Sequence, residues 1–110
     1  MSDNKEREKQ ELSLEIIALA AIKAVLATEG VSEMAEPATV AAIIKPSSAK
    51  GIRLTRHDNG LELDITLNVK FGASIPTIAW NIQENVKKKL EALTECEIAK
   101  VDVHIAGVTG

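Results

Sequence analysis

The chain has 110 residues, of which 45% are hydrophobic and 2% are aromatic, and its formal net charge is −3. This length predicts one domain, and the core of that domain must be aliphatic. The acidic balance argues against a general nucleic-acid binder, because phosphate contacts need clustered Lys and Arg. The longest uninterrupted apolar run, residues 16–22, is too short for a membrane span, which needs about 20 residues.

The N-terminal segment is charged and has no apolar core, so it does not resemble a signal peptide. Residues 1–11 mix both signs of charge and predict a disordered tail, followed by a single α+β domain over residues 12–110. The lone cysteine, Cys96, is typical of a protein of the reducing cytoplasm. The expected location is therefore cytoplasmic, with any membrane contact made at a surface or through a partner.

The first predicted helix covers residues 14–28, which are rich in alanine, and Gly30 follows as a stop signal. Lys23 is the one charged residue between Ile16 and Ala27. A helix that is apolar nearly all round is usually covered on more than one side.

The segment 31–50 has no clear periodicity. Residues 38–44 could form a short helix after Pro37, and residues 46–48 resemble a loop. Such a helix could cover the second apolar side of the first helix.

Strict alternation of apolar and polar residues from Leu61 to Phe71 predicts a strand with one buried face. Residues 52–56 form the preceding strand, and Asn59-Gly60 is a strong hairpin signal because both positions tolerate positive φ. That turn would set Leu54 opposite Ile65. The other face of the hairpin would then be polar, with Arg53, His57, Glu62, Asp64, Thr66, Asn68 and Lys70.

Residues 72–76 end this strand and open a second helix, with Ser74 as the cap and Pro76 in the first turn. The helix is amphipathic, since apolar residues recur every three or four positions at Ile78, Ala79, Ile82, Val86, Leu90 and Leu93. Alternation at residues 101–105 predicts a last strand that closes at Gly107.

These elements predict an α+β fold of two layers, in the order helix, strand, strand, helix, strand. A three-stranded sheet, made of the hairpin and the C-terminal strand, would carry both helices on one face. The last strand lies either antiparallel beside the first strand or parallel beside the second. The sequence leaves both arrangements open.

Signs of catalysis are missing from the sequence. There is no Gly-x-Ser-x-Gly, no phosphate-binding glycine loop and no paired Cys and His in a known pattern. His57 and His104 should project from the polar sheet face, near Glu62, Asp64 and Asp102. Alternation puts them on one face without making them converge on one point, which favours a solvated surface over a metal site. The prediction is therefore a protein without catalytic, cofactor or metal residues.

Three residues are candidates for contact with a partner: Trp80, Lys87 and Lys88. Trp80 lies about 200° around the helix from Ile78, at ~100° per residue, and is therefore off the apolar stripe. Tryptophan is enriched at binding hot spots, although its ring could also fold over the sheet edge. The three lysines at positions 87–89 point to different sides of the helix, so the simpler interpretation is that they are solvated. The alternative function is weak binding of nucleic acid or an anionic surface through this run with Arg53 and Lys70.

Several motifs resemble the alkaline-shock, or envelope-stress-response, family of Gram-positive and related bacteria. They are Glu15-Ile16-Ile17 opening an Ala-rich helix, Thr28-Glu29-Gly30-Val31 ending it, Gly72-Ala73-Ser74-Ile75-Pro76, Asn81-Ile82-Gln83-Glu84-Asn85-Val86, and Val101-Asp102-Val103-His104-Ile105. The resemblance spans roughly residues 12–108. Two features depart from it: segment 31–50 lacks the glycine-rich stretch of many members, and Trp80 replaces an expected polar residue.

The resemblance implies a small cytoplasmic α+β protein without catalytic residues. Family members are associated with cell-envelope homeostasis and stress, and some gather at the membrane through a membrane-anchored partner. The expected function is therefore a non-enzymatic interaction or structural role, with a protein partner, a homo-oligomer, or both, and with no specific nucleic acid and no transmembrane segment.

Overall fold

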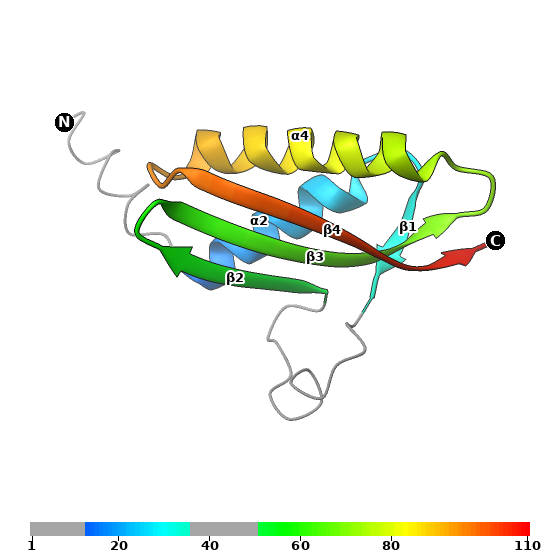
Figure 1. Cartoon of the computed structure of the whole chain (residues 1–110), viewed down its shortest axis with the longest axis horizontal. Helices are drawn as coiled ribbons and strands as arrows, with labels where there is room; N and C mark the ends of the chain where they lie inside the picture. Colours follow the sequence, from blue (N-terminus) through cyan, green and yellow to red (C-terminus); the bar gives the residue numbers. More distant parts are fainter. Residues whose placement is uncertain (1–12, 36–50) are drawn as a thin grey trace, which may run out of the picture.

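The computed structural model describes residues 13–35 and 51–110 (Figure 1). Its α+β class agrees with the sequence prediction, but the sheet has four strands rather than three. The predicted tail at residues 1–11 and the predicted helix at residues 38–44 lie outside the described residues. In chain order, the elements are α2 (Leu14–Leu26), β1 (Val31–Met34), β2 (Ile52–His57), β3 (Gly60–Lys70), α4 (Ile75–Leu93) and β4 (Ile98–Thr109).

β3 is the central strand of a mixed sheet. Along one edge it pairs in parallel with β4, which settles the strand order that the sequence left open. Along the other edge it pairs antiparallel with β2 through residues 60–65 and with β1 through residues 67–69. Thr66 lies at the junction, where its N–H donates to the Gly51 carbonyl and its carbonyl accepts from the Ala35 N–H. The two short strands therefore follow one another along a single edge of β3.

β1 is the strand that sequence analysis missed. It has four residues, and the register shifts between Val31 and Glu33, which leaves Ser32 as a bulge. Val31 and Met34 are buried, so the apolar positions are three residues apart instead of two. A short bulged strand gives no run of alternation from which it could be recognised.

The hairpin prediction was right in its faces and wrong in its register. His57 pairs with Gly60 and Leu54 pairs with Leu63, so Asp58 and Asn59 form the turn. Among the described residues, no residue other than glycine has a positive φ, and Gly60 has φ 130°. Asp58 and Asn59 therefore turn with negative φ, and the positive φ falls on Gly60, the residue that follows them. A shift of two residues preserves which side chains share a face.

Both helices cover the same face of the sheet, as predicted. In Figure 1, α2 crosses behind the strands and α4 runs along the β4 side of the sheet. The odd-numbered side chains of β3 are buried against them: Leu61, Leu63, Ile65, Leu67 and Val69. They meet Ile17, Ala18, Ala21 and Val25 of α2 and Ile78, Ile82, Val86 and Leu90 of α4.

The two helix caps use serine in different ways. Ser13 begins α2, and its side-chain oxygen accepts from the Ile16 N–H at 3.3 Å. Ser74 begins α4 as predicted, but its hydroxyl donates to Thr77 Oγ1 at 3.0 Å rather than capping a backbone N–H. Pro76 occupies the first turn, where a backbone N–H would have no helical partner.

A buried hydroxyl joins the two helices. Thr28 Oγ1 donates to the Ala24 carbonyl at 2.9 Å and accepts from Asn85 Nδ2 at 3.0 Å. Thr28 is buried just after α2, so this contact fixes the end of α2 against the middle of α4.

Thr28→Val should therefore destabilise the domain by about 1–2 kcal/mol, because the isosteric change removes the two hydrogen bonds of the buried hydroxyl, to the Ala24 carbonyl and from the Asn85 amide. Urea denaturation followed by circular dichroism measures this loss. Thr55→Val is the matched control, since Thr55 is exposed on β2. Equal losses in the two variants would contradict a specific role for the buried hydroxyl.

Candidate functional site

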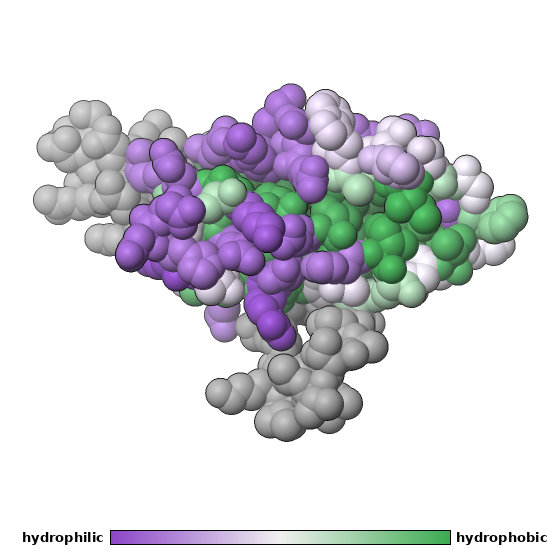
Figure 2. Space-filling model, in the orientation of Figure 1, coloured by the Kyte–Doolittle hydropathy of each residue, from purple (hydrophilic) through white to green (hydrophobic). Residues whose placement is uncertain are grey.

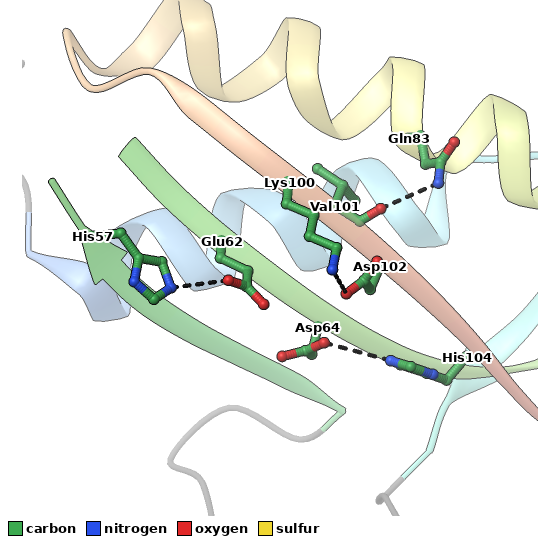
Figure 3. Close-up of polar contacts among 8 residues, drawn as sticks. All are labelled: His57, Glu62, Asp64, Gln83, Lys100, Val101, Asp102 and His104. Atoms are coloured by element: carbon green, nitrogen blue, oxygen red, sulfur yellow. Dashed lines mark hydrogen bonds and ion pairs between the residues drawn. The ribbon is translucent and has the colours of Figure 1, made fainter. Parts of the chain in front are cut away.

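The polar face of the sheet gathers titratable side chains from three strands (Figure 3). His57 comes from β2, Glu62 and Asp64 from β3, and Lys100, Asp102 and His104 from β4. His57 Nε2 lies 2.8 Å from Glu62 Oε2, and His104 Nε2 lies 3.4 Å from Asp64 Oδ1. Alternation in the sequence predicted this common face. Each histidine contacts its own carboxylate, so the two imidazoles do not converge on one point.

Three half-buried carboxylates lie at the centre of this face. The oxygens of Glu62, Asp64 and Asp102 fall within 4.8 Å of one another. Lys100 Nζ is 3.3 Å from Asp102 Oδ2, and the hydrogen bond and charge of Asp102 raise the pKa of the Lys100 ammonium. The lysine therefore supplies a positive charge beside the carboxylates, and the face has the mixed-charge character that the sequence predicted.

Thr66 corrects one part of that prediction. It points to the polar face, as alternation requires, yet it is only 7% exposed. β3 is flanked on both edges, so neighbouring strands cover the short side chains on either face of it.

The predicted contact residues lie on α4. Trp80 keeps 61% of its surface exposed, which confirms that it lies off the buried stripe of the helix. Lys87 and Lys88 are exposed too, and Lys87 Nζ lies 4.0 Å from Glu91 Oε1. Arg53 on β2 and Lys70 at the end of β3 belong to the sheet layer, so the cations proposed for an anionic ligand do not form one surface.

Comparison with known proteins gives the family. Residues 2–110 match the alkaline shock protein 23 family, which is described as having a cell envelope-related function. The chain belongs to the alkaline shock protein 23 family. This agrees with the resemblance found in the sequence motifs, and it makes a cell envelope-related function the expected setting.

Two relatives of this alkaline shock protein 23 family chain are described only as uncharacterised proteins. YqhY of Bacillus subtilis is 32% identical over 103 residues, which cover 91% of this chain and 76% of YqhY. Spy1535 of Streptococcus pyogenes is 31% identical over 81 residues, which cover 73% of this chain and 63% of Spy1535.

The fold also occurs in solved structures of the MamM C-terminal domain. One matches with a TM-score of 0.61 over 86% of this chain and 99% of that domain, at 13% identity. A variant of the same domain matches with a TM-score of 0.60 over 87% of this chain and 84% of the variant chain, also at 13% identity. At this identity, the likeness concerns the fold alone.

Within residues 13–35 and 51–110, no helix is both long and apolar enough to cross a membrane. The most apolar helix is α2, and its outer face is exposed. Ile16, Leu19 and Leu26 are 49%, 59% and 50% exposed, and Lys23 lies among them. Sequence analysis expected α2 to be covered on more than one side, but the described residues cover only the side that faces the sheet and α4.

A second apolar surface lies at one end of the domain. Phe71, Ile75 and Val108 are exposed where β3 ends, α4 begins and β4 ends, and Trp80 is exposed further along α4. Phe71 was expected to be the last buried residue of its strand, but β3 ends at Lys70 and Phe71 is 83% exposed. Phe71 carried no signal of its own in the sequence, because it fits the apolar positions of β3. Val108 lies beyond Gly107, where the last strand was expected to close, but β4 continues to Thr109.

Proposed function

We propose that this alkaline shock protein 23 family chain is a non-enzymatic interaction protein of the envelope-stress-response type. It acts in cell-envelope homeostasis by binding proteins, either further copies of itself or a membrane-anchored partner. The family description, which is cell envelope-related, supports the setting. The exposed apolar surfaces support the mode of action.

The observation that carries this proposal is the outer face of α2. Ile16 and Leu19 are three residues apart and Leu26 is seven further on, so the three side chains follow one side of the helix. Each is about half exposed. Monomeric proteins rarely leave contiguous apolar side chains in water, and such patches commonly mark contact with another molecule.

The polar sheet face supports the same conclusion by contrast. Its histidines and its lysine each contact a carboxylate, and the Phe and Trp residues of the chain, Phe71 and Trp80, lie outside its strands. Exposed ion pairs contribute little binding free energy, whereas aromatic and large aliphatic side chains dominate hot spots. Partner contact is therefore expected on the helix side of the molecule.

Site-specific photocross-linking in the native host tests this proposal. A photoreactive residue at position 19, on the outer face of α2, should give discrete protein adducts in the membrane fraction. The same residue at position 55, which is exposed on the polar sheet face, should give few. Adducts at position 55 alone, or no protein adduct at either position, would refute an interaction role centred on the helices.

A further inference from the structure

β4 is an edge strand of the sheet. Among the described residues, it pairs with β3 alone. The N–H and carbonyl of Thr66 bond to Gly51 and Ala35 on the other edge of β3, so the odd residues of β3 on either side of Thr66 bond to β4. In a parallel ladder, the β4 residues opposite those odd residues point their own N–H and carbonyl groups outward. They are Val101, Val103 and Ile105, which lie opposite Leu63, Ile65 and Leu67.

Gln83 confirms this direction and occupies one of the outward groups. Its Nε2 reaches down from α4 and donates to the Val101 carbonyl at 3.1 Å (Figure 3). No hydrogen bond from the described residues reaches the outward N–H and carbonyl groups of Val103 and Ile105. A register shift just after Ile105 then interrupts the strand. We call residues 101–105, with their outward backbone groups, the open β4 edge.

The helix side of the open β4 edge is incompletely covered. Ile65 and Leu67 of β3 are fully buried, but Val103 and Ile105 beside them are only half-buried. Figure 2 shows hydrophobic side chains exposed between α4 and β4, toward the end where α4 begins and β4 ends. One more strand beside β4 would cover these side chains, because α4 packs along β4 on the same face of the sheet.

Trp80 lies beside the same stretch. It is three residues before Gln83, so it lies on the same side of α4, about 4.5 Å nearer the helix start. β4 runs toward the start of α4 (Figure 1), and this distance corresponds to about one or two strand residues beyond Val101. Trp80 is 61% exposed. A strand added to β4 would therefore pack against an aromatic side chain that faces solvent in the isolated domain.

Hydrogen bonding indicates which occupant fits the open β4 edge. N–H and carbonyl groups that recur at every second residue match the backbone of another extended chain. Lipid tails have no such groups, and a helix uses its own backbone groups internally. A second copy could offer its own β4, but paired strands lie about 4.8 Å apart, whereas packed helices need about 8–10 Å. The two α4 helices, each packed along its own β4, would then collide.

The outer edge of β2 is a poorer site for such a strand. It has six residues, and Arg53, Arg56 and His57 are exposed along it. Charged side chains on a short edge strand discourage the addition of another strand. In the open β4 edge, the odd positions are all apolar.

We propose that the open β4 edge binds an extended segment of a partner protein, which joins the sheet as an additional strand. Alternate side chains of that segment are apolar and pack on the helix side, against Trp80. The others join the polar face beside Asp102 and His104. The inference rests on the proposed interaction role, and it names the form of the partner segment and the surface that it occupies. The outer face of α2 stays free for a separate contact.

Phage-displayed random peptides, selected on the full chain, supply the probe. The selected peptides should alternate apolar and polar residues. One synthetic peptide of this set is then N-methylated at every second residue, in two versions of opposite parity. The version that loses the N–H groups facing β4 should raise the dissociation constant by about tenfold or more, and the other version should change it little. Fluorescence anisotropy measures both.

Val103→Pro tests the same contact from the side of the protein. Proline removes an N–H that points away from β3, so the ladder between β3 and β4 is kept. This variant should bind the peptide about tenfold more weakly or worse, and Trp80→Ser, which leaves the strand untouched, should also weaken binding. Leu19→Asp is the matched control for Trp80→Ser, because Leu19 is 59% exposed and Trp80 is 61% exposed. Circular dichroism verifies that all three variants are folded.

Four results would overturn the inference. A selection that yields no binding peptide would exclude it, and so would peptides that bind equally well in both methylated versions. Peptides that are lost with Leu19→Asp, and retained with Val103→Pro and Trp80→Ser, would move the contact to α2. A dimer of the free chain that Val103→Pro dissociates would make a second copy the occupant. The proposed interaction role would survive each of these results, since it depends on the cross-links formed from position 19.

Discussion

Ile65→Asp will unfold the domain. Ile65 lies at the middle of β3, is fully buried, and pairs with Ile52 of β2 on one side and Val103 of β4 on the other. The substitution forfeits about 1.5–3 kcal/mol of apolar burial. It also places a carboxylate among aliphatic side chains, which costs several kcal/mol more or forces the carboxyl to take up a proton. The sum is comparable to the whole stability of a small domain, about 5–15 kcal/mol.

Leu19→Asp is the control for this prediction. It makes a similar aliphatic-to-carboxylate change at a site that is 59% exposed on α2. We expect a loss within about 1 kcal/mol, most of it from the lower helix propensity of aspartate. Far-UV circular dichroism at 25 °C and a urea titration distinguish the two variants. If both lose stability equally, the assignment of the odd residues of β3 to the core is wrong.

The faces of the sheet could be predicted because the information is local. Alternation with a period of two is written in consecutive residues, and it placed Leu61, Leu63 and Ile65 in the core and Glu62 and Asp64 on the other face. The second helix was equally clear, since its apolar spacing marks one side. The location of Trp80 off that side followed from the same geometry.

Strand pairing could not be predicted, because it depends on residues far apart in the chain. The observed and the predicted hairpin registers put the same side chains on the same face of the sheet. The hydrophobic pattern therefore cannot distinguish the two registers. Local alternation also does not predict which strand β4 pairs with. β1 was not predicted, because its bulge at Ser32 interrupts the alternation of apolar and polar residues.

The apolar contact surfaces were found only in part for a related reason. Phe71 continues the apolar positions of β3, and nothing local says that the helix layer no longer covers it. Val108 is out of step with the alternation at residues 101–105, because the register shifts between Ile105 and Gly107. Their exposure depends on where α4 begins relative to the ends of β3 and β4. The polar sheet face was predicted correctly, but Thr66 was expected to be exposed to solvent and is buried. Alternation gives the direction of a side chain, but it does not say how far neighbouring strands cover it.

Gly60→Ala should destabilise the hairpin strongly. Gly60 has φ 130°, and a Cβ atom added there would clash with the Glu97 carbonyl oxygen. That carbonyl accepts from the Leu61 N–H at 2.7 Å, which ties the hairpin to the start of β4. A methyl group at Gly60 would therefore strain the backbone and push this contact apart. The expected loss is about 2–4 kcal/mol.

Gly72→Ala separates the two causes. Gly72 also has a positive φ, 84°, but an added Cβ would meet no atom within 4 Å. It should lose only the conformational cost of about 1–2 kcal/mol. The difference between the two variants in urea midpoint, converted with a common m-value, then measures the crowding against Glu97. If Gly60→Ala is no more damaging than Gly72→Ala, the contact between the turn and β4 has room to relax. The hairpin would then be fixed by the backbone conformation of Gly60 alone.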